Sequence, residues 1–122
     1  QLINDYVKDR LGGLHSAKLL LYSVDFEEIE RWQASGDWDK SAQRLTEIAK
    51  KLEGAGADFI VICTNTMHKV VPQMEKELSV PILHIADATA DALLAAGIRT
   101  VGLLGTKYTM TQDFYKSRLE QR

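Results

Sequence analysis

Four short, continuous apolar runs separated by segments of helical periodicity constrain the fold of this chain more than any other feature. They predict strands at Lys18–Val24, Asp58–Cys63, Pro81–Ile85 and Thr100–Leu104. Apolar spacing and turn residues predict helices between and around the strands, at residues 2–8, 26–34, 39–53, 64–78, 88–96 and 113–122. Because the runs are continuous rather than alternating, both faces of the sheet are expected to be covered. The sequence therefore predicts an α/β fold with a parallel sheet sandwiched by helices.

Residue chemistry at the helix ends refines these predictions. Asp87 is the expected N-cap of the helix that begins at Ala88 and that Gly97 terminates. Thr109 and Gln112 have the spacing of a capping box for the last helix. The chain begins and ends inside predicted helices, at Gln1 and Arg122, so we interpret both ends as cut from a longer protein.

Composition excludes several classes of partner. The chain has 122 residues, 45% of them hydrophobic and 26% charged, and a net charge of −2 with scattered cations, so no nucleic-acid interface is expected. No apolar run approaches the roughly 20 residues of a membrane-spanning helix, and no signal peptide opens the chain. A single cysteine cannot form an internal disulfide, which is typical of a cytoplasmic protein.

That cysteine, Cys63, is expected where the second strand ends and a helix begins. The unpaired N–H groups and the dipole of such a helix favour a thiolate. The same N–H groups, with the side chains of Thr64, Asn65 and Thr66, could hold a small carboxylate. A thiolate beside a carboxylate cradle suits proton abstraction from the neighbouring carbon. The alternative, equally open on spacing alone, is a buried strand-end cysteine followed by an ordinary N-cap residue.

The segment Ile62–Lys69, ICTNTMHK, resembles the first active-site segment of the Asp/Glu racemase superfamily, in its aspartate and broad-specificity branch. Glutamate racemases carry a similar segment with Asn directly after the cysteine. Four further stretches agree in the same register: residues 11–17, 23–26, 83–89 and 103–110. The resemblance spans nearly the whole chain.

The resemblance implies an enzyme with two similar α/β domains and a catalytic cysteine from each on opposite faces of the substrate Cα. One thiolate removes the proton and the other thiol returns one, without pyridoxal phosphate, any other cofactor or a metal. Cys63 corresponds to the first cysteine, and Thr64, Asn65 and Thr66 to residues that bind the substrate. Residues 1–98 would be the N-terminal domain without its first strand, and residues 99–122 the start of the second.

The expected function is thus racemisation or epimerisation of a small amino acid, aspartate or glutamate first. The expected partners are that substrate and a second copy of the chain in a homodimer, with no nucleic acid and no membrane. Because the second cysteine would lie beyond Arg122, the 122 residues alone are expected to be inactive. The alternatives are a hydantoin racemase or maleate isomerase of the same superfamily, and a non-catalytic module that binds small acids. Malonate decarboxylases, which keep only the other cysteine, are disfavoured by Cys63.

Other polar residues have weaker claims to function. His68 could relay a proton, but a solvated or capping histidine is the commoner case, and His84 is judged alike. His15 and the tryptophans are expected to be structural, and Lys69 to point to water. Asp25 could pair with a substrate ammonium or simply cap the next helix. No paired histidines or further cysteines support a metal site.

Overall fold

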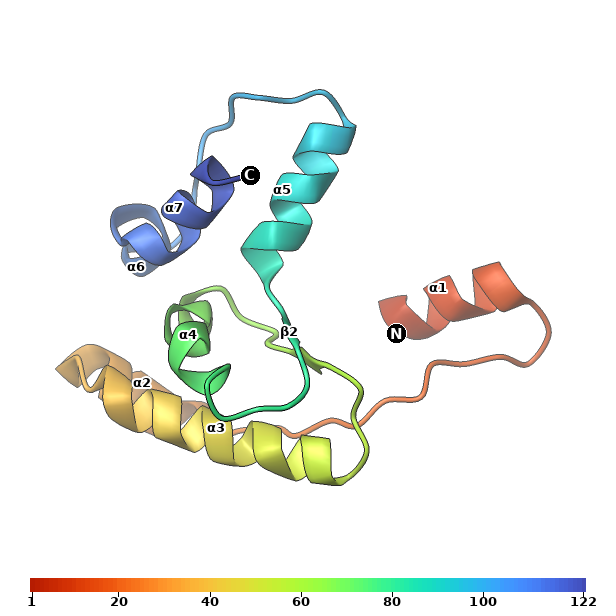
Figure 1. Ribbon diagram of the computed structural model, residues 1–122, viewed down its shortest axis with the longest axis horizontal. Helices are drawn as coiled ribbons and strands as arrows, with labels where there is room; N and C mark the ends of the chain where they lie inside the picture. Colours follow the sequence, from red (N-terminus) through yellow and green to blue (C-terminus); the bar gives the residue numbers. More distant parts are fainter.

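A computed structural model describes all residues, 1–122. Figure 1 shows two groups of helices joined by a small sheet, with the first helix standing to one side. The elements in chain order are α1 (Leu2–Leu11), α2 (Phe26–Ser35), α3 (Trp38–Gly54), β1 (Ile60–Val61), the 3₁₀ helix η1 (Thr66–Val70), α4 (Val71–Met74), β2 (Ile82–Leu83), α5 (Ile85–Ala95), α6 (Lys107–Thr111) and α7 (Asp113–Glu120).

The sheet consists of β1 and β2, which pair in parallel with Ile60 opposite Ile82 and Val61 opposite Leu83. A parallel pair needs a crossover, and η1 and α4 supply it. The α/β class and the parallel pairing of these two predicted strands are confirmed. Ile60 and Ile82 are buried, whereas Val61 and Leu83 are 52% and 50% exposed. Helices therefore cover one face of the sheet, and the predicted cover on both faces is wrong for this chain.

The predicted strands Lys18–Val24 and Thr100–Leu104 are also wrong, because both segments lack regular secondary structure. A strand is defined by hydrogen bonds to a neighbour, and β1 and β2 pair only with each other. The apolar side chains of the first segment stay largely outside the core, with Leu21 87% exposed. Hydrophobic composition favours a strand here but cannot supply the strand that would pair with it.

Helices α2 and α3 form where the apolar spacing predicts them, and they pack against each other. Asp25 caps α2 by accepting a hydrogen bond from the Glu27 N–H, so the capping interpretation of this residue is confirmed. Gly36 ends α2 in the left-handed conformation with φ 74°. Asp37 then caps α3 through the Lys40 N–H, which gives a sharp turn between the two helices.

The single helix predicted after Cys63 is wrong: two short helices, η1 and α4, replace it, and η1 begins only at Thr66. Pro72 is the physical reason for the break. It has no N–H to donate to the carbonyl of His68 four residues earlier, and the Val71 N–H bonds that carbonyl instead with 3₁₀ spacing.

Two predicted caps are corrected as well. The N-cap of α5 is His84 rather than Asp87, and its Nδ1 accepts a hydrogen bond from the Ala86 N–H at 3.1 Å. Thr109 lies inside α6, and the N-cap of α7 is Gln112 without a side-chain cap, so the predicted capping box is wrong.

The core lies between the covered face of the sheet, α3, η1 and α4. Its buried members are small or aliphatic side chains from these elements: Ala42, Ala49, Ile60, Val70, Val71, Met74 and Ile82. Helix α7 packs against α5 and η1. The division into residues 1–98 and 99–122 stays a prediction. No helix is both long and apolar enough to span a membrane.

Truncating Met74 should show how much stability this core supplies. Met74 is 1% exposed, so Met74→Ala leaves a cavity and should cost about 2–5 kcal/mol of unfolding free energy. Met110 is 44% exposed, and Met110→Ala is the matched control, expected to change it by less than about 0.5 kcal/mol. Urea unfolding measures both variants. Equal losses would show that the core lies elsewhere.

Candidate functional site

Cys63 lies just beyond the carboxyl end of β1, as its place in the sequence predicts. Its side chain is exposed and makes no disulfide. The alternative of a buried strand-end cysteine is therefore wrong. Residues 63–65 belong to no helix or strand, and we call them the Cys63 loop. An accessible thiol beyond the carboxyl end of a parallel strand lies where ligands bind in open α/β sheets.

The polar groups around Cys63 have few partners within the protein. The backbone N–H groups of residues 63–65 donate to no backbone acceptor. Asn65 occupies the N-cap position of η1, but its side chain makes no capping hydrogen bond. The interpretation of Asn65 as an ordinary cap is therefore not supported. Thr64 and Asn65 are exposed, whereas Thr66 is buried at the start of η1. The N–H groups of the Cys63 loop and the Asn65 amide are thus uncommitted within the protein.

His68 and His84 form a buried pair at the carboxyl ends of the two strands. They are 1% and 4% exposed, and their ring centroids lie 4.5 Å apart in an edge-to-face arrangement. His68 is thus not the solvated residue that the sequence suggests. Burial lowers the pKa of His68 below its ordinary value. Burial, followed by the charges of Arg118 and His68, lowers the pKa of His84 to about 4.

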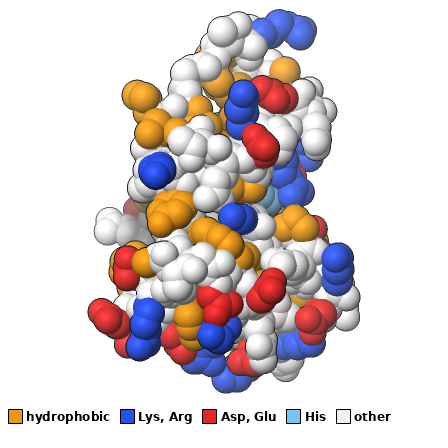
Figure 2. All heavy atoms as spheres, turned by 90° about the vertical axis from the view of Figure 1, so that its left-hand side faces the viewer, with side chains coloured by type: hydrophobic (Ala, Val, Ile, Leu, Met, Phe, Trp, Pro, Cys, Tyr) orange, Lys and Arg blue, Asp and Glu red, His pale blue; other side chains and the backbone are white.

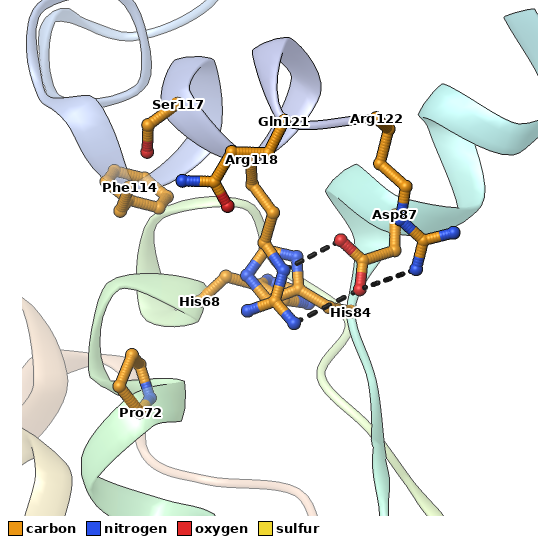
Figure 3. A pocket seen from close by; sticks show the side chains of 9 residues that line it. All are labelled: His68, Pro72, His84, Asp87, Phe114, Ser117, Arg118, Gln121 and Arg122. Carbon is orange, nitrogen blue, oxygen red and sulfur yellow. Dashed lines mark hydrogen bonds and ion pairs between the residues drawn. The ribbon is translucent and has the colours of Figure 1, made fainter.

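A pocket of about 410 Å³ opens beside this pair. Figure 3 shows its wall, formed by the histidines, Pro72 below them and side chains of α5 and α7 above. Arg118 of α7 binds Asp87 of α5 with two hydrogen bonds, of 2.7 and 3.1 Å, and holds the pKa of Asp87 below its ordinary value. Figure 2 shows histidine atoms at the waist between the upper and lower parts of the molecule, next to cationic side chains.

Arg118 is one of several residues of this pocket that the sequence does not single out. Its partner Asp87 lies 31 positions away along the chain, so no local spacing signals the pair. Arg122 approaches the same carboxylate at 3.6 Å and also bonds Asp91 at 2.6 Å. Because the cations are paired with carboxylates, they primarily join α5 to α7.

Lys69 does not simply point to water. Its Nζ lies 4.0 Å from the centroid of the Trp38 ring, and burial lowers the pKa of Lys69. Trp38 in turn meets Tyr108 edge to face, with centroids 6.1 Å apart. This contact joins α3, η1 and α6, in keeping with a structural role for the tryptophan. No three His, Cys, Asp or Glu side chains lie close enough to share a metal ion.

Acid should destabilise the fold through His84. Unfolded His84 binds a proton near pH 6.5, whereas folded His84 resists protonation until pH approaches 4, so stability is lost as pH falls through this window. The loss for His84 alone is about 2 kcal/mol between pH 7 and pH 5. His84→Asn keeps a side-chain oxygen for the cap but does not titrate, so urea unfolding should show a smaller loss. Equal losses in variant and wild type would exclude His84 as the source.

Several curated proteins with sequences similar to this chain are racemases. The broad-specificity amino-acid racemase RacX of Bacillus subtilis (strain 168) is 33% identical over 84 residues, covering 69% of this chain and 37% of that protein. A glutamate racemase of Haemophilus ducreyi is 32% identical over 81 residues, covering 65% of this chain and 31% of that protein. The chain thus spans about a third of the length of these relatives.

Comparison with solved structures gives the same result. A Yersinia pestis protein, provisionally described as an Asp/Glu racemase, is 57% identical with a TM-score of 0.93. An aspartate racemase homologue from Pyrococcus horikoshii OT3 is 37% identical with a TM-score of 0.85. Each match covers 98% of this chain and 52% of the other. The family model described as Asp/Glu/Hydantoin racemase matches residues 1–122, and the chain therefore belongs to the Asp/Glu/hydantoin racemase family.

Proposed function

We propose that this chain is part of an amino-acid racemase in which Cys63 is one of two thiols that exchange the α-proton, with aspartate or glutamate as first substrates. The observation that carries the proposal is the exposed Cys63 thiol in a loop whose N–H groups and Asn65 side chain are uncommitted. The family supports racemisation in general. The substrate and the two-thiol mechanism are our proposal.

The chemistry follows from the groups around Cys63. The free N–H groups and the Asn65 amide donate hydrogen bonds to the substrate carboxylate. The Cys63 thiolate takes the proton from Cα and becomes a thiol, while the electron pair of the C–H bond moves toward the carboxylate. Donors already aimed at that carboxylate stabilise the developing charge without reorganising. A second thiol on the opposite face, from outside these residues, protonates Cα and completes the inversion.

This mechanism invokes neither pyridoxal phosphate nor a metal, because it assigns both proton transfers to the thiol pair and stabilisation of the developing charge to the hydrogen-bond donors at the carboxylate. Two-base inversion needs an acid and a base on opposite faces at the same moment, and Cys63 serves one face. We therefore expect the 122 residues alone not to racemise amino acids. A homodimer, the two-domain arrangement and a cytoplasmic location stay predictions.

Hydantoin racemisation is the second candidate, because the family description includes it. A hydantoin ring also carries an acidic C–H beside a carbonyl, so the same thiolate could abstract that proton. Incubating the full-length protein with aspartate, glutamate or a 5-substituted hydantoin, and measuring inversion by chiral chromatography, distinguishes amino-acid racemisation from hydantoin racemisation. Turnover of the hydantoin alone would replace the amino-acid assignment, and binding without turnover of any of them would indicate a non-catalytic module.

Replacing the Cys63 thiol should stop the reaction without unfolding the protein. In the full-length protein, Cys63→Ser should lower kcat by at least about a hundredfold in one direction or both, because a serine hydroxyl is a far poorer base. Loss of the α-proton signal by NMR in D₂O measures proton removal, and chiral chromatography measures inversion. The exposed position of Cys63 predicts an unchanged circular dichroism spectrum. Full activity in the folded variant would end the mechanism.

Asn65→Ala should weaken the carboxylate cradle. Loss of a hydrogen bond to a charged group costs about 1.5–3 kcal/mol, or on the order of tenfold to a hundredfold in kcat/KM. The other asparagine offers a matched control: Asn4 bonds the Ala17 N–H beside α1, and Asn4→Ala should leave kcat/KM unchanged. Equal effects of the two variants would mean that the substrate binds elsewhere.

A further inference from the structure

Both ring nitrogens of His68 are engaged by backbone groups. Nδ1 lies 2.7 Å from the Thr64 carbonyl oxygen, and Nε2 lies 3.2 Å from the Ile85 backbone N, whose N–H it accepts. A neutral imidazole has one donor and one acceptor nitrogen. A carbonyl can only accept and an N–H can only donate, so these partners require the proton on Nδ1. His68 is thus held in one neutral tautomer.

The Cys63 loop has few other attachments. The Thr64 carbonyl accepts from the His68 ring, and the Asn65 carbonyl accepts from the His68 backbone N–H at 3.1 Å. No other backbone hydrogen bond reaches residues 63–65. The loop is exposed and lies outside any helix or strand. His68 therefore donates every hydrogen bond that the backbone of this loop accepts.

The surroundings keep His68 neutral. The His84 ring packs edge to face against it from the N-cap of α5, and the charged side chains that act on the pKa of His68 are Arg118, which lowers it, and Asp87, which raises it. A proton on Nε2 would meet the Ile85 N–H, donor against donor, and would break the link to α5. A nitrogen occupied in this way cannot pass protons to a substrate. The proton-relay interpretation of His68 is therefore disfavoured by its own hydrogen bonds.

We propose that His68 is a positioning residue: its Nδ1–H and Nε2 join the Cys63 loop to the N-terminus of α5 and thereby fix the conformation of the loop that carries the Cys63 thiol. The hydrogen bond at Nε2 joins η1, which follows β1, to Ile85, the first residue of α5, which follows β2. His68 acts through the loop and touches no reacting atom. The anchoring is independent of which substrate the loop serves. Its effect on racemisation rests on the proposed function.

The tautomer can be measured without any variant. In ¹⁵N-labelled full-length protein, ring-nitrogen shifts distinguish a protonated nitrogen from a bare one. We expect His68 to keep Nδ1 protonated and Nε2 bare from pH 8 to pH 5. An Nε2–H tautomer, or a His68 ring that gains a second proton between pH 8 and pH 5, would overturn the proposal.

Cys63 alkylation tests the anchoring. In His68→Asn the amide NH₂ sits near the position of Nδ1 and can still donate to the Thr64 carbonyl, whereas His68→Leu cannot. We expect the rate at which iodoacetamide labels the Cys63 peptide, quantified by mass spectrometry, to change at least about threefold in His68→Leu, because release of the loop changes the surroundings of the thiol. In His68→Asn the rate should stay within about twofold of wild type. The same rate in all three proteins, or an equal change in both variants, would overturn the anchoring role.

Two controls separate anchoring from general damage and from the racemase proposal. His84→Asn disturbs the same buried pair but not the bond to Thr64, so its labelling rate should match that of wild type. In racemisation, kcat/KM should fall about tenfold to a hundredfold in His68→Leu and recover in His68→Asn, with an unshifted pH profile in the rescued variant. A shifted pH profile of kcat/KM in His68→Asn would instead support the proton-relay role of His68. If wild type fails to racemise, the proposed function fails, whereas labelling and ring shifts still decide the role of His68.

Discussion

The parallel pairing of β1 with β2 determines how the rest of the molecule is arranged. Parallel strands need a crossover, so the chain between them must leave the sheet and return, and η1 and α4 are that crossover. The same pairing places both carboxyl ends at one edge of the sheet. Cys63 after the first strand and His84 after the second are thereby brought to that edge, although 21 positions separate them in the sequence.

Burial and hydrogen bonding at this edge work together. His68 and His84 are buried, which disfavours a charged imidazole, and backbone groups form hydrogen bonds with the neutral rings. Beyond them, the Arg118–Asp87 pair joins α7 to α5. The Cys63 loop is thus bonded to His68, and Figure 3 shows His68 and His84 next to the Arg118–Asp87 pair that joins the two helices.

Local pattern predicted the elements whose partners lie nearby. The helix predicted from amphipathic spacing, α3, and the strand predicted from the apolar run around Ile60, β1, both form, because they pack against the same core. The run at Leu19–Leu21 fails, because a strand exists only beside another strand and none lies next to it here. The helix predicted after Cys63 is longer than the helices that form. Its composition favours a helix throughout, but the missing N–H of Pro72 breaks the backbone hydrogen bonding.

Sequence by itself determined the α/β class, the family resemblance and the position of Cys63 at a strand end, since each depends on residue order and local periodicity. Only the tertiary structure decided that the thiol is exposed, that Asn65 caps nothing, and that His68 and His84 meet edge to face. Only it revealed that Arg118 belongs beside Asp87. The physical reason is distance along the chain: burial, tautomer and ion pairing depend on groups brought together by the strand crossover and helix packing, which no local pattern encodes.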